Sequence, residues 1–93
     1  MSKDHIIIYT KEQCGYCVLA KNLLKNLGLD YVEKKLTDFA STEALIGDIG
    51  KNVKSMPQIK INGELIGGFN QLKEYYIDKG LVNFKGEILN DWW

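Results

Sequence analysis

Residues 6–36 have the sequence IIIYTKEQCGYCVLAKNLLKNLGLDYVEKKL, in which three patterns follow one another. The β-branched and aromatic run over residues 6–9 predicts a buried strand, because it is too short for a helix. Residues 14–27 change to a helical period, with one apolar arc that consists of Cys17, Leu19, Ala20, Leu23, Leu24 and Leu27. Gly28 ends this helix, and residues 31–36 predict a second strand. Such a strand–helix–strand unit is normally a right-handed crossover with parallel strands.

The second half of the chain predicts a short helix followed by a hairpin. Ser41 or Thr42 caps the helix, which ends at Gly50. Residues 58–61 and 64–66 predict two strands. The Asn-Gly dipeptide between them supplies the positive φ angles of a type I′ turn, so we expect these strands to pair as a hairpin.

The last predicted element is a helix after Gly67-Gly68. Its apolar side chains are Leu72, Tyr75 and Tyr76, and it ends near Gly80. The order of elements is therefore βαβ followed by αββα. This order is typical of the thioredoxin-like fold, an α/β architecture in which a four-stranded mixed sheet is flanked by helices on both faces.

The composition excludes several classes of protein. The chain has 93 residues, of which 45% are hydrophobic, and its 12 basic residues balance 12 acidic ones. This length predicts a single domain over residues 1–93, and the neutral charge disfavours a nucleic-acid-binding protein. No apolar run approaches the roughly 20 residues that cross a bilayer, and no signal peptide is recognised at the start. We therefore expect a cytoplasmic monomer that binds neither nucleic acid nor membrane.

The two cysteines form the run Cys14-Gly15-Tyr16-Cys17. A structural disulfide is disfavoured, because a bridge between residues this close together stabilises the fold very little. A structural zinc site is also disfavoured, because it needs four ligands and only His5 could join the two cysteines. Reactive thiol chemistry is therefore favoured over the alternative of two ordinary small core residues.

The predicted helix gives the two sulfurs different positions. Cys14 falls on the outer side at the helix start, where backbone N–H groups favour a negative charge, and Cys17 falls on the apolar arc. Lys11 is either a cation that assists Cys14 or a solvated loop lysine. In the predicted mechanism, Cys14 attacks a disulfide and Cys17, one helical turn away, resolves the mixed disulfide.

Two further motifs each have a structural and a functional interpretation. Pro57 is the only proline. It marks the first residue of a strand, or it forms a cis bond that leaves Met56 extended and free to pair with a bound peptide. Gly67-Gly68 forms a tight turn, or it allows the backbone to approach an anionic ligand at a helix N-terminus.

Three segments together resemble a known family. They are residues 9–17 (YTKEQCGYC), Met56-Pro57-Gln58 and residues 66–72 (IGGFNQL). In this order and spacing they are similar to the dithiol glutaredoxins, with phage-encoded members the most similar. The resemblance covers a core of roughly residues 5–79 and implies the thioredoxin-like fold that the element order predicts.

The resemblance implies a glutathione-dependent thiol–disulfide oxidoreductase. Its substrates would be protein disulfides and glutathione mixed disulfides, with ribonucleotide reductase as one client, and no metal is expected. Cys14 would be the nucleophile and Cys17 the resolving thiol. The glutathione-binding residues that the resemblance implies are Lys11, Tyr16, Lys54, Met56, Pro57, Gly68, Phe69 and Asn70.

These residues would contact different parts of glutathione. Lys11 and Tyr16 would line the groove, and Lys54 would meet the glycine carboxylate. Met56 would pair with the cysteinyl backbone, and the backbone N–H groups of residues 68–70 would receive the γ-glutamyl end.

Departures from the family pattern leave two other functions open. Gly15 stands where glutaredoxins usually have proline, and Asn70 stands where many have aspartate. Relatives with a small residue in place of that proline include carriers of a [2Fe–2S] cluster, which is the main alternative. A thioredoxin-like reductant recycled by a flavoenzyme is the other, and Gln13 disfavours it because thioredoxins usually have tryptophan there.

The C-terminal extension over residues 81–93 is too apolar to be a typical solvated end. Its large apolar side chains are Phe84, Ile88, Leu89, Trp92 and Trp93. We expect it to pack back on the sheet, and a partner-binding patch is the alternative.

Overall fold

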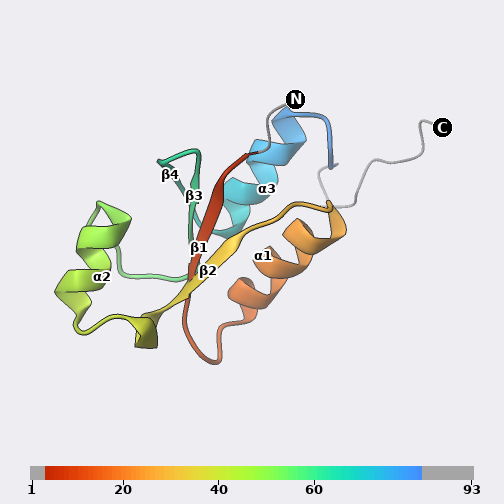
Figure 1. Ribbon diagram of the computed structural model, residues 1–93. Helices are drawn as coiled ribbons and strands as arrows, with labels where there is room; N and C mark the ends of the chain where they lie inside the picture. The colour runs from red at the N-terminus through yellow and green to blue at the C-terminus, as the bar shows by residue number, and fades with distance from the viewer. Residues whose placement is uncertain (1–3, 83–93) are drawn as a thin grey trace.

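The computed structural model describes residues 4–82 (Figure 1). In chain order, the elements are β1 (Ile6–Thr10), α1 (Gly15–Asn26), β2 (Val32–Lys35), a 3-10 helix (Leu36–Asp38), α2 (Thr42–Ile49), β3 (Gln58–Ile61), β4 (Glu64–Gly67) and α3 (Phe69–Asp78). The predicted order of elements is confirmed. None of the helices in this part of the chain is long and apolar enough to cross a membrane. Residues 83–93, most of the predicted extension, lie outside the described residues.

The four strands form one mixed sheet in the order β2-β1-β3-β4. β1 pairs in parallel with β2, where Thr10 lies opposite Lys35, and it pairs antiparallel with β3. The hairpin of β3 and β4 turns at Asn62 and Gly63, whose φ angles of 55° and 86° confirm the predicted type I′ turn. The central strand β1 therefore leads directly into the loop before α1, which is where the cysteines lie.

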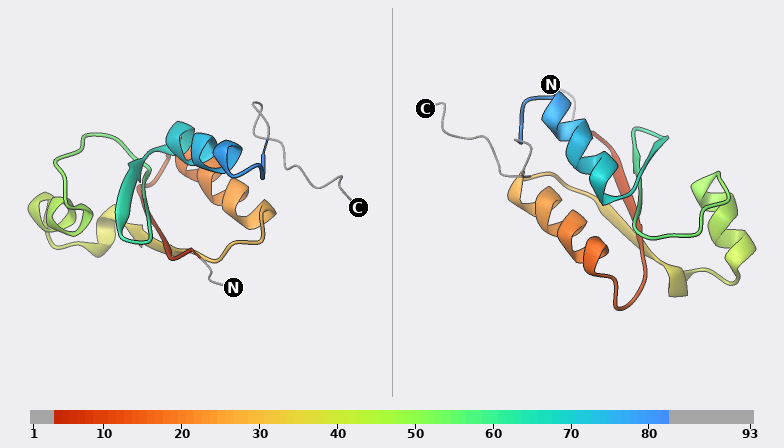
Figure 2. Two further views of the ribbon diagram at one scale, coloured as in Figure 1. Left: turned by 90° about the horizontal axis from the view of Figure 1, so that it is seen from above. Right: turned by 180° about the vertical axis from the view of Figure 1, so that it is seen from behind.

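Helices cover both faces of the sheet. α1 and α3 lie side by side on one face, and α2 lies on the other (Figure 2). Side chains of β1 alternate between two hydrophobic cores, one on each face of the sheet. Ile6 and Ile8 pack in the core under α1 and α3, and Tyr9 packs in the core under α2. Since α1 and α3 share one core, the fold holds their N-terminal turns next to each other.

The apolar arc of α1 agrees with the prediction except at one position. Cys17, Ala20, Leu23 and Leu24 are buried, whereas Leu19 is 47% exposed, so the prediction for Leu19 is wrong. At about 100° per residue, Leu19 lies about 110° from the centre of the buried arc. It therefore stands at the margin of the arc, where the sheet no longer covers the helix.

Local hydrogen bonds set the bounds of the next two elements. The predicted strand over residues 31–36 is too long, because Leu36 begins the 3-10 helix and the Lys35 N–H donates to Asp38 Oδ2 at 2.9 Å. Ser41 is the cap of α2, and its hydroxyl oxygen accepts from the Ala44 N–H at 3.1 Å.

Asp48, near the end of α2, joins this helix to three strands of the sheet. Its carboxylate accepts from the Tyr9 hydroxyl at 2.7 Å and from Lys34 Nζ at 3.0 Å, and its backbone carbonyl accepts from Lys60 Nζ at 2.6 Å. The Tyr9 hydrogen bond, assisted by Lys34, holds the pKa of Asp48 below its usual range. The charged carboxylate therefore stabilises the fold.

Replacing Asp48 with asparagine tests this link. Because folding lowers the pKa of Asp48, its carboxylate contributes fully above the pKa of an unfolded aspartate, and the contribution is lost as the pH falls through the lower folded value. We expect Asp48→Asn to lower the free energy of unfolding by about 1 kcal/mol at pH 7. The difference from the unmodified chain should shrink below about pH 4.

Urea unfolding at pH 7 and at pH 3 measures this difference. Glu74→Gln, an exposed carboxylate on α3, is the control and should change the free energy of unfolding by less than about 0.5 kcal/mol. A loss for Asp48→Asn that is equal at both pH values would contradict the role of the charge.

Candidate active site

Cys14 and Cys17 lie where β1 leads into α1. They form a disulfide, with their Cα atoms 5.2 Å apart. Cys14 is the N-cap of α1 and is half-buried, whereas Cys17 is 2% exposed. The predicted difference between an outer and an inner sulfur is confirmed.

The Cys14 sulfur lies where a negative charge is stabilised. The Cys17 N–H donates to Cys14 Sγ at 3.1 Å, and the N-terminal end of α1 adds its partial positive charge. Cys14 Sγ also lies 3.6 Å from the backbone carbonyl oxygen of Met56. This carbonyl can accept a hydrogen bond from the Cys14 thiol, whereas the Cys17 N–H and the start of α1 favour its thiolate, so Cys14 is the sulfur suited to be a nucleophile.

A groove of about 240 Å³ lies next to Cys14, between the first turns of α1 and α3. The Tyr16 and Phe69 rings face each other there, with centroids 6.1 Å apart. The peptide bond between Met56 and Pro57 is cis, which agrees with the functional interpretation of Pro57. We call this the α3 groove; it is lined by Tyr16, Ser55, Met56, Pro57, Gly68, Phe69, Asn70 and Gln71.

The two glycines before α3 have different roles. Gly67 has a φ of +119°, which other residues rarely adopt. A Cβ on Gly68 would lie 3.3 Å from the backbone carbonyl oxygen of Pro57, so the missing side chain lets α3 approach closely. The Gly68 N–H, one of the predicted ligand donors, already donates to Gln71 Oε1 at 3.0 Å. The N–H groups of Phe69 and Asn70 belong to the first turn of α3, and N–H groups in a first turn have no acceptor within the helix.

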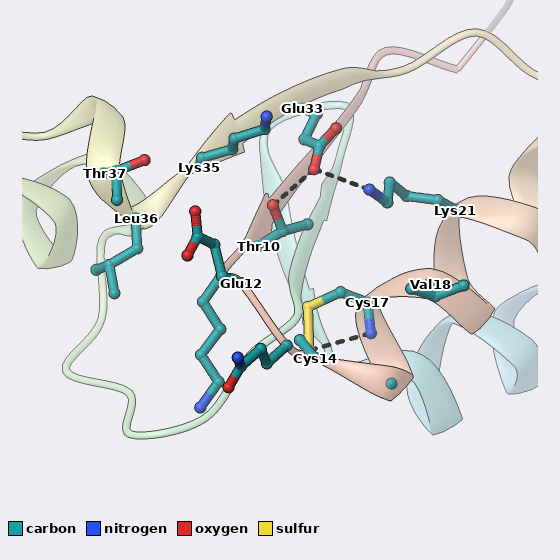
Figure 3. A pocket seen from close by; sticks show the side chains of 13 residues that line it. Thr10, Glu12, Cys14, Cys17, Val18, Lys21, Glu33, Lys35, Leu36 and Thr37 are labelled. Carbon is teal, nitrogen blue, oxygen red and sulfur yellow. Dashed lines mark hydrogen bonds and ion pairs between the residues drawn. A yellow bond between two sulfur atoms is a disulfide. The ribbon is translucent and has the colours of Figure 1, made fainter.

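A second cavity, of about 690 Å³, lies on the β2 side of the disulfide. Its walls are the end of β1, residues 11–13, the first two turns of α1, Glu33 and residues 35–37 (Figure 3). Both cysteines line it, and so does Lys11. We call it the β2 cavity. The disulfide therefore stands between two recesses of different composition.

Three side chains in the wall of the β2 cavity form a hydrogen-bonded group. Glu33 Oε2 accepts from the Thr10 hydroxyl at 2.7 Å and from Lys21 Nζ at 3.1 Å (Figure 3). The Thr10 hydrogen bond is the main reason why the pKa of Glu33 lies below its usual range, and Lys21 acts in the same direction. Glu33 is therefore a carboxylate at neutral pH, although it is partly buried.

The structure separates the predicted glutathione-binding residues into two sets. Six of the eight line the α3 groove, whereas Lys11 lines the β2 cavity and Lys54 is exposed and lines neither. Ser55 and Gln71 also line the α3 groove, although neither was predicted from the sequence. Gln71 stands three residues after the cap Gly68, and this capping spacing is a signal that could have found it. Within residues 4–82, no group of three or more His, Cys, Asp and Glu side chains could hold a metal ion.

Comparison with known sequences identifies the family. The family model for glutaredoxins matches residues 6–66. Glutaredoxin 1 of Rickettsia conorii is 37% identical over 84 residues, which cover 84% of this chain and 81% of that protein. Glutaredoxin 3 of Escherichia coli K12 is 38% identical over 69 residues, which cover 73% of this chain and 81% of that protein.

Other relatives are longer than this chain. Mitochondrial glutaredoxin-2 of Bos taurus is 33% identical over 72 residues, which cover 73% of this chain and only 45% of that protein. The hybrid peroxiredoxin hyPrx5 of Haemophilus influenzae is 34% identical over 74 residues, which cover 80% of this chain and 30% of that protein. The chain thus spans less than half the length of these two relatives.

Solved structures agree with the sequence comparison. Glutaredoxin 1 from Francisella tularensis, complexed with cacodylate, superposes with a TM-score of 0.68 at 30% identity and covers 84% of this chain and 96% of its own. A buckwheat glutaredoxin–glutathione complex gives 0.67 at 28% identity, over 82% of this chain and 71% of its own. The predicted thioredoxin-like fold is confirmed, while the closeness to phage-encoded members stays a prediction. By sequence and by structure, the chain belongs to the glutaredoxin family.

Proposed function

We propose that this chain is a thiol–disulfide oxidoreductase that reduces protein disulfides and glutathione mixed disulfides, and that glutathione restores its reduced state. The observation that carries the proposal is the position of Cys14 Sγ at the start of α1, 3.1 Å from the Cys17 backbone nitrogen, with Cys17 buried behind it. Membership of the glutaredoxin family supports the oxidoreductase activity. The buckwheat glutaredoxin–glutathione complex supports the choice of ligand.

The two cysteines divide the reaction into successive exchanges. The Cys14 thiolate attacks a client disulfide, which forms a Cys14–client bond and releases the other client sulfur as a thiolate. The Cys17 thiolate then attacks Cys14 Sγ, which closes the Cys14–Cys17 disulfide and releases the second client thiolate. One glutathione thiolate reopens this disulfide by forming a bond to Cys14. A second glutathione thiolate attacks the bound glutathione sulfur, which yields glutathione disulfide and the Cys14 thiolate.

The α3 groove is the proposed glutathione site. It adjoins Cys14 through Met56, whose carbonyl contacts the sulfur, and it offers the aromatic faces of Tyr16 and Phe69. The first turn of α3 presents N–H groups and a partial positive charge, which favour a carboxylate such as that of the γ-glutamyl end. Lys11 and Lys54 lie outside the groove, and their contacts with glutathione stay predictions.

A glutathione-coupled assay tests the function. Glutathione, glutathione reductase and NADPH are supplied with hydroxyethyl disulfide, and NADPH consumption reports turnover. We expect turnover that depends on both glutathione and this chain. Turnover with thioredoxin reductase in place of glutathione would instead support the alternative of a reductant recycled by a flavoenzyme.

The groove assignment predicts an effect at Tyr16. Tyr16 and Val18 are both more than half exposed near the start of α1, but Tyr16 lines the α3 groove and Val18 lines the β2 cavity. We expect Tyr16→Ala to raise the KM for glutathione by about three- to tenfold, because it removes an aromatic contact with the ligand. Val18→Ala is the control and should change this KM by less than about twofold. Equal effects of the two substitutions would exclude the α3 groove as the glutathione site.

Gly15 keeps a second candidate function open, that of a carrier of a [2Fe–2S] cluster. Apart from its chain neighbours and its own helix, nothing in residues 4–82 lies within 4 Å of the position that a Cβ on Gly15 would take, so this side of the start of α1 is open to solvent or to a second subunit. Visible absorbance after anaerobic purification tests this candidate, and a colourless monomer with full reductase activity would exclude it. Ribonucleotide reductase as client, the monomeric state and the cytoplasmic location also stay predictions.

A further inference from the structure

Cys17 has to carry a negative charge in a buried position. In the proposed function, on which this inference rests, Cys17 leaves as a thiolate when glutathione attacks Cys14, and it attacks as a thiolate when a client is released. Cys17 is 2% exposed, and its own N–H is directed to the other sulfur. Water therefore solvates this thiolate poorly, and a buried charge without a partner is costly.

Lys21 is a cation on the same helix as Cys17, and like Cys17 it lines the β2 cavity. Lys21 follows Cys17 by four residues, so the two side chains lie on the same side of the helix, one turn apart. Both line the β2 cavity. Lys21 does not extend into solvent, because its Nζ donates to Glu33 Oε2 at 3.1 Å (Figure 3).

Glu33 is in turn held by Thr10. The Thr10 side chain comes from β1, is 2% exposed, and donates to the same Glu33 oxygen at 2.7 Å. Three elements, β1, β2 and α1, thus meet at one carboxylate oxygen. This arrangement fixes the Lys21 ammonium group in the wall of the β2 cavity, which both cysteines also line, instead of leaving it on a flexible surface side chain.

The other charged groups that line the cavity do not replace Lys21. Lys11 and Glu12 are exposed neighbours of opposite charge in the loop before α1. Lys35 on β2 is exposed and acts electrostatically on Glu33. Glu33 thus interacts with two lysines, Lys21 and Lys35, so its single negative charge is outweighed on this wall of the cavity.

We propose that Lys21 stabilises the thiolate form of Cys17, and that Glu33 and Thr10 are positioning residues that hold Lys21 for this purpose. When the glutathione thiolate bonds to Cys14 Sγ, the bond between the two cysteines breaks and its electron pair leaves with Cys17 Sγ. Lys21 offsets that charge until a proton arrives from solvent. In the client-releasing step, the same cation keeps more Cys17 in the reactive thiolate form.

The pH profile of Cys17 alkylation tests the proposal directly. In a Cys14→Ser chain, Cys17 is the only thiol, and the rate of its reaction with iodoacetamide follows its thiolate fraction. We expect Lys21→Gln to move the midpoint of this profile upward by about 0.5 to 1 pH unit, which lowers the thiolate fraction about three- to tenfold at neutral pH. Lys21→Arg keeps the charge and should restore the midpoint to within about 0.2 pH unit.

Lys25→Gln is the matched control, because Lys25 is an exposed lysine of the same helix that lines neither recess. A midpoint that Lys21→Gln does not move, that Lys25→Gln moves equally, or that Lys21→Arg fails to restore would overturn the inference. The alkylation profile needs no glutathione. A failed glutathione-coupled assay therefore counts against the proposed function alone, and an unmoved midpoint counts against the role of Lys21 alone.

A second measurement separates the two kinds of exchange. The proposal requires Lys21→Gln to slow dithiol reduction of a protein disulfide more than it slows monothiol reduction of a glutathione mixed disulfide in a Cys17→Ser background. We expect the first loss to exceed the second by about threefold or more. Equal losses would show that Lys21 acts on the fold or on Cys14, and would also overturn the inference.

Discussion

A Cys14→Ser chain is expected to lose at least about a hundredfold in rate on both protein disulfides and glutathione mixed disulfides. The structure gives the reason, because the start of α1 and the Cys17 N–H both stabilise a negative charge on the Cys14 sulfur. A serine hydroxyl in that place stays protonated at neutral pH and cannot open a disulfide. Cys17 cannot take over the role, since it is buried behind the first turn.

A Cys17→Ser chain is expected to divide the two activities. It should keep at least about half of the rate on glutathione mixed disulfides, where Cys14 alone exchanges with glutathione. It should lose about tenfold or more on protein disulfides, because no thiol remains to release the client from Cys14. Circular dichroism of both variants controls for folding. Substantial activity of Cys14→Ser on either substrate would contradict the assignment of the nucleophile.

Local signals were enough to predict the positions of the two cysteine sulfurs. The spacing of Cys14 and Cys17 and the helical period after them place one sulfur at a helix start and the other on the buried arc. Local signals could not predict the α3 groove, because its walls come from three segments that are distant in sequence. Only the family resemblance joined them, and it placed Lys11 and Lys54 beside a groove that neither residue lines.

The group of Thr10, Lys21 and Glu33 had no local signal at all. Each residue has an ordinary place in its own element, and the pairing of β1 with β2 brings two of them together. The strand order β2-β1-β3-β4 is likewise set by long-range pairing, which periodicity does not contain. Features that depend on a few neighbouring residues, such as the type I′ turn and the Ser41 cap, were predicted correctly.

The second large expected effect is on the free energy of unfolding, and it follows from truncating Leu24, a buried residue of α1. Leu24 is 0% exposed and packs in the core that α1 and α3 share. Removing most of a buried leucine side chain usually costs about 2–5 kcal/mol, from lost burial and from the cavity left behind. We expect Leu24→Ala to lower the free energy of unfolding by this amount, and to lower the Tm by about 10–25 °C in a domain of this size.

Leu19→Ala is the matched control, because Leu19 has the same side chain, lies on the same helix and belongs to the same predicted apolar arc. Its 47% exposure means that truncation should cost less than about 0.5 kcal/mol. Urea and thermal unfolding of the oxidised chains measure both losses, and equal losses would contradict the burial assigned to α1. The turnover of Leu24→Ala should stay within about twofold of the unmodified chain well below its Tm. Leu24 lies two turns beyond Cys17, whereas the Cys14 cap and the Cys17 N–H at the helix start determine the environment of the nucleophile.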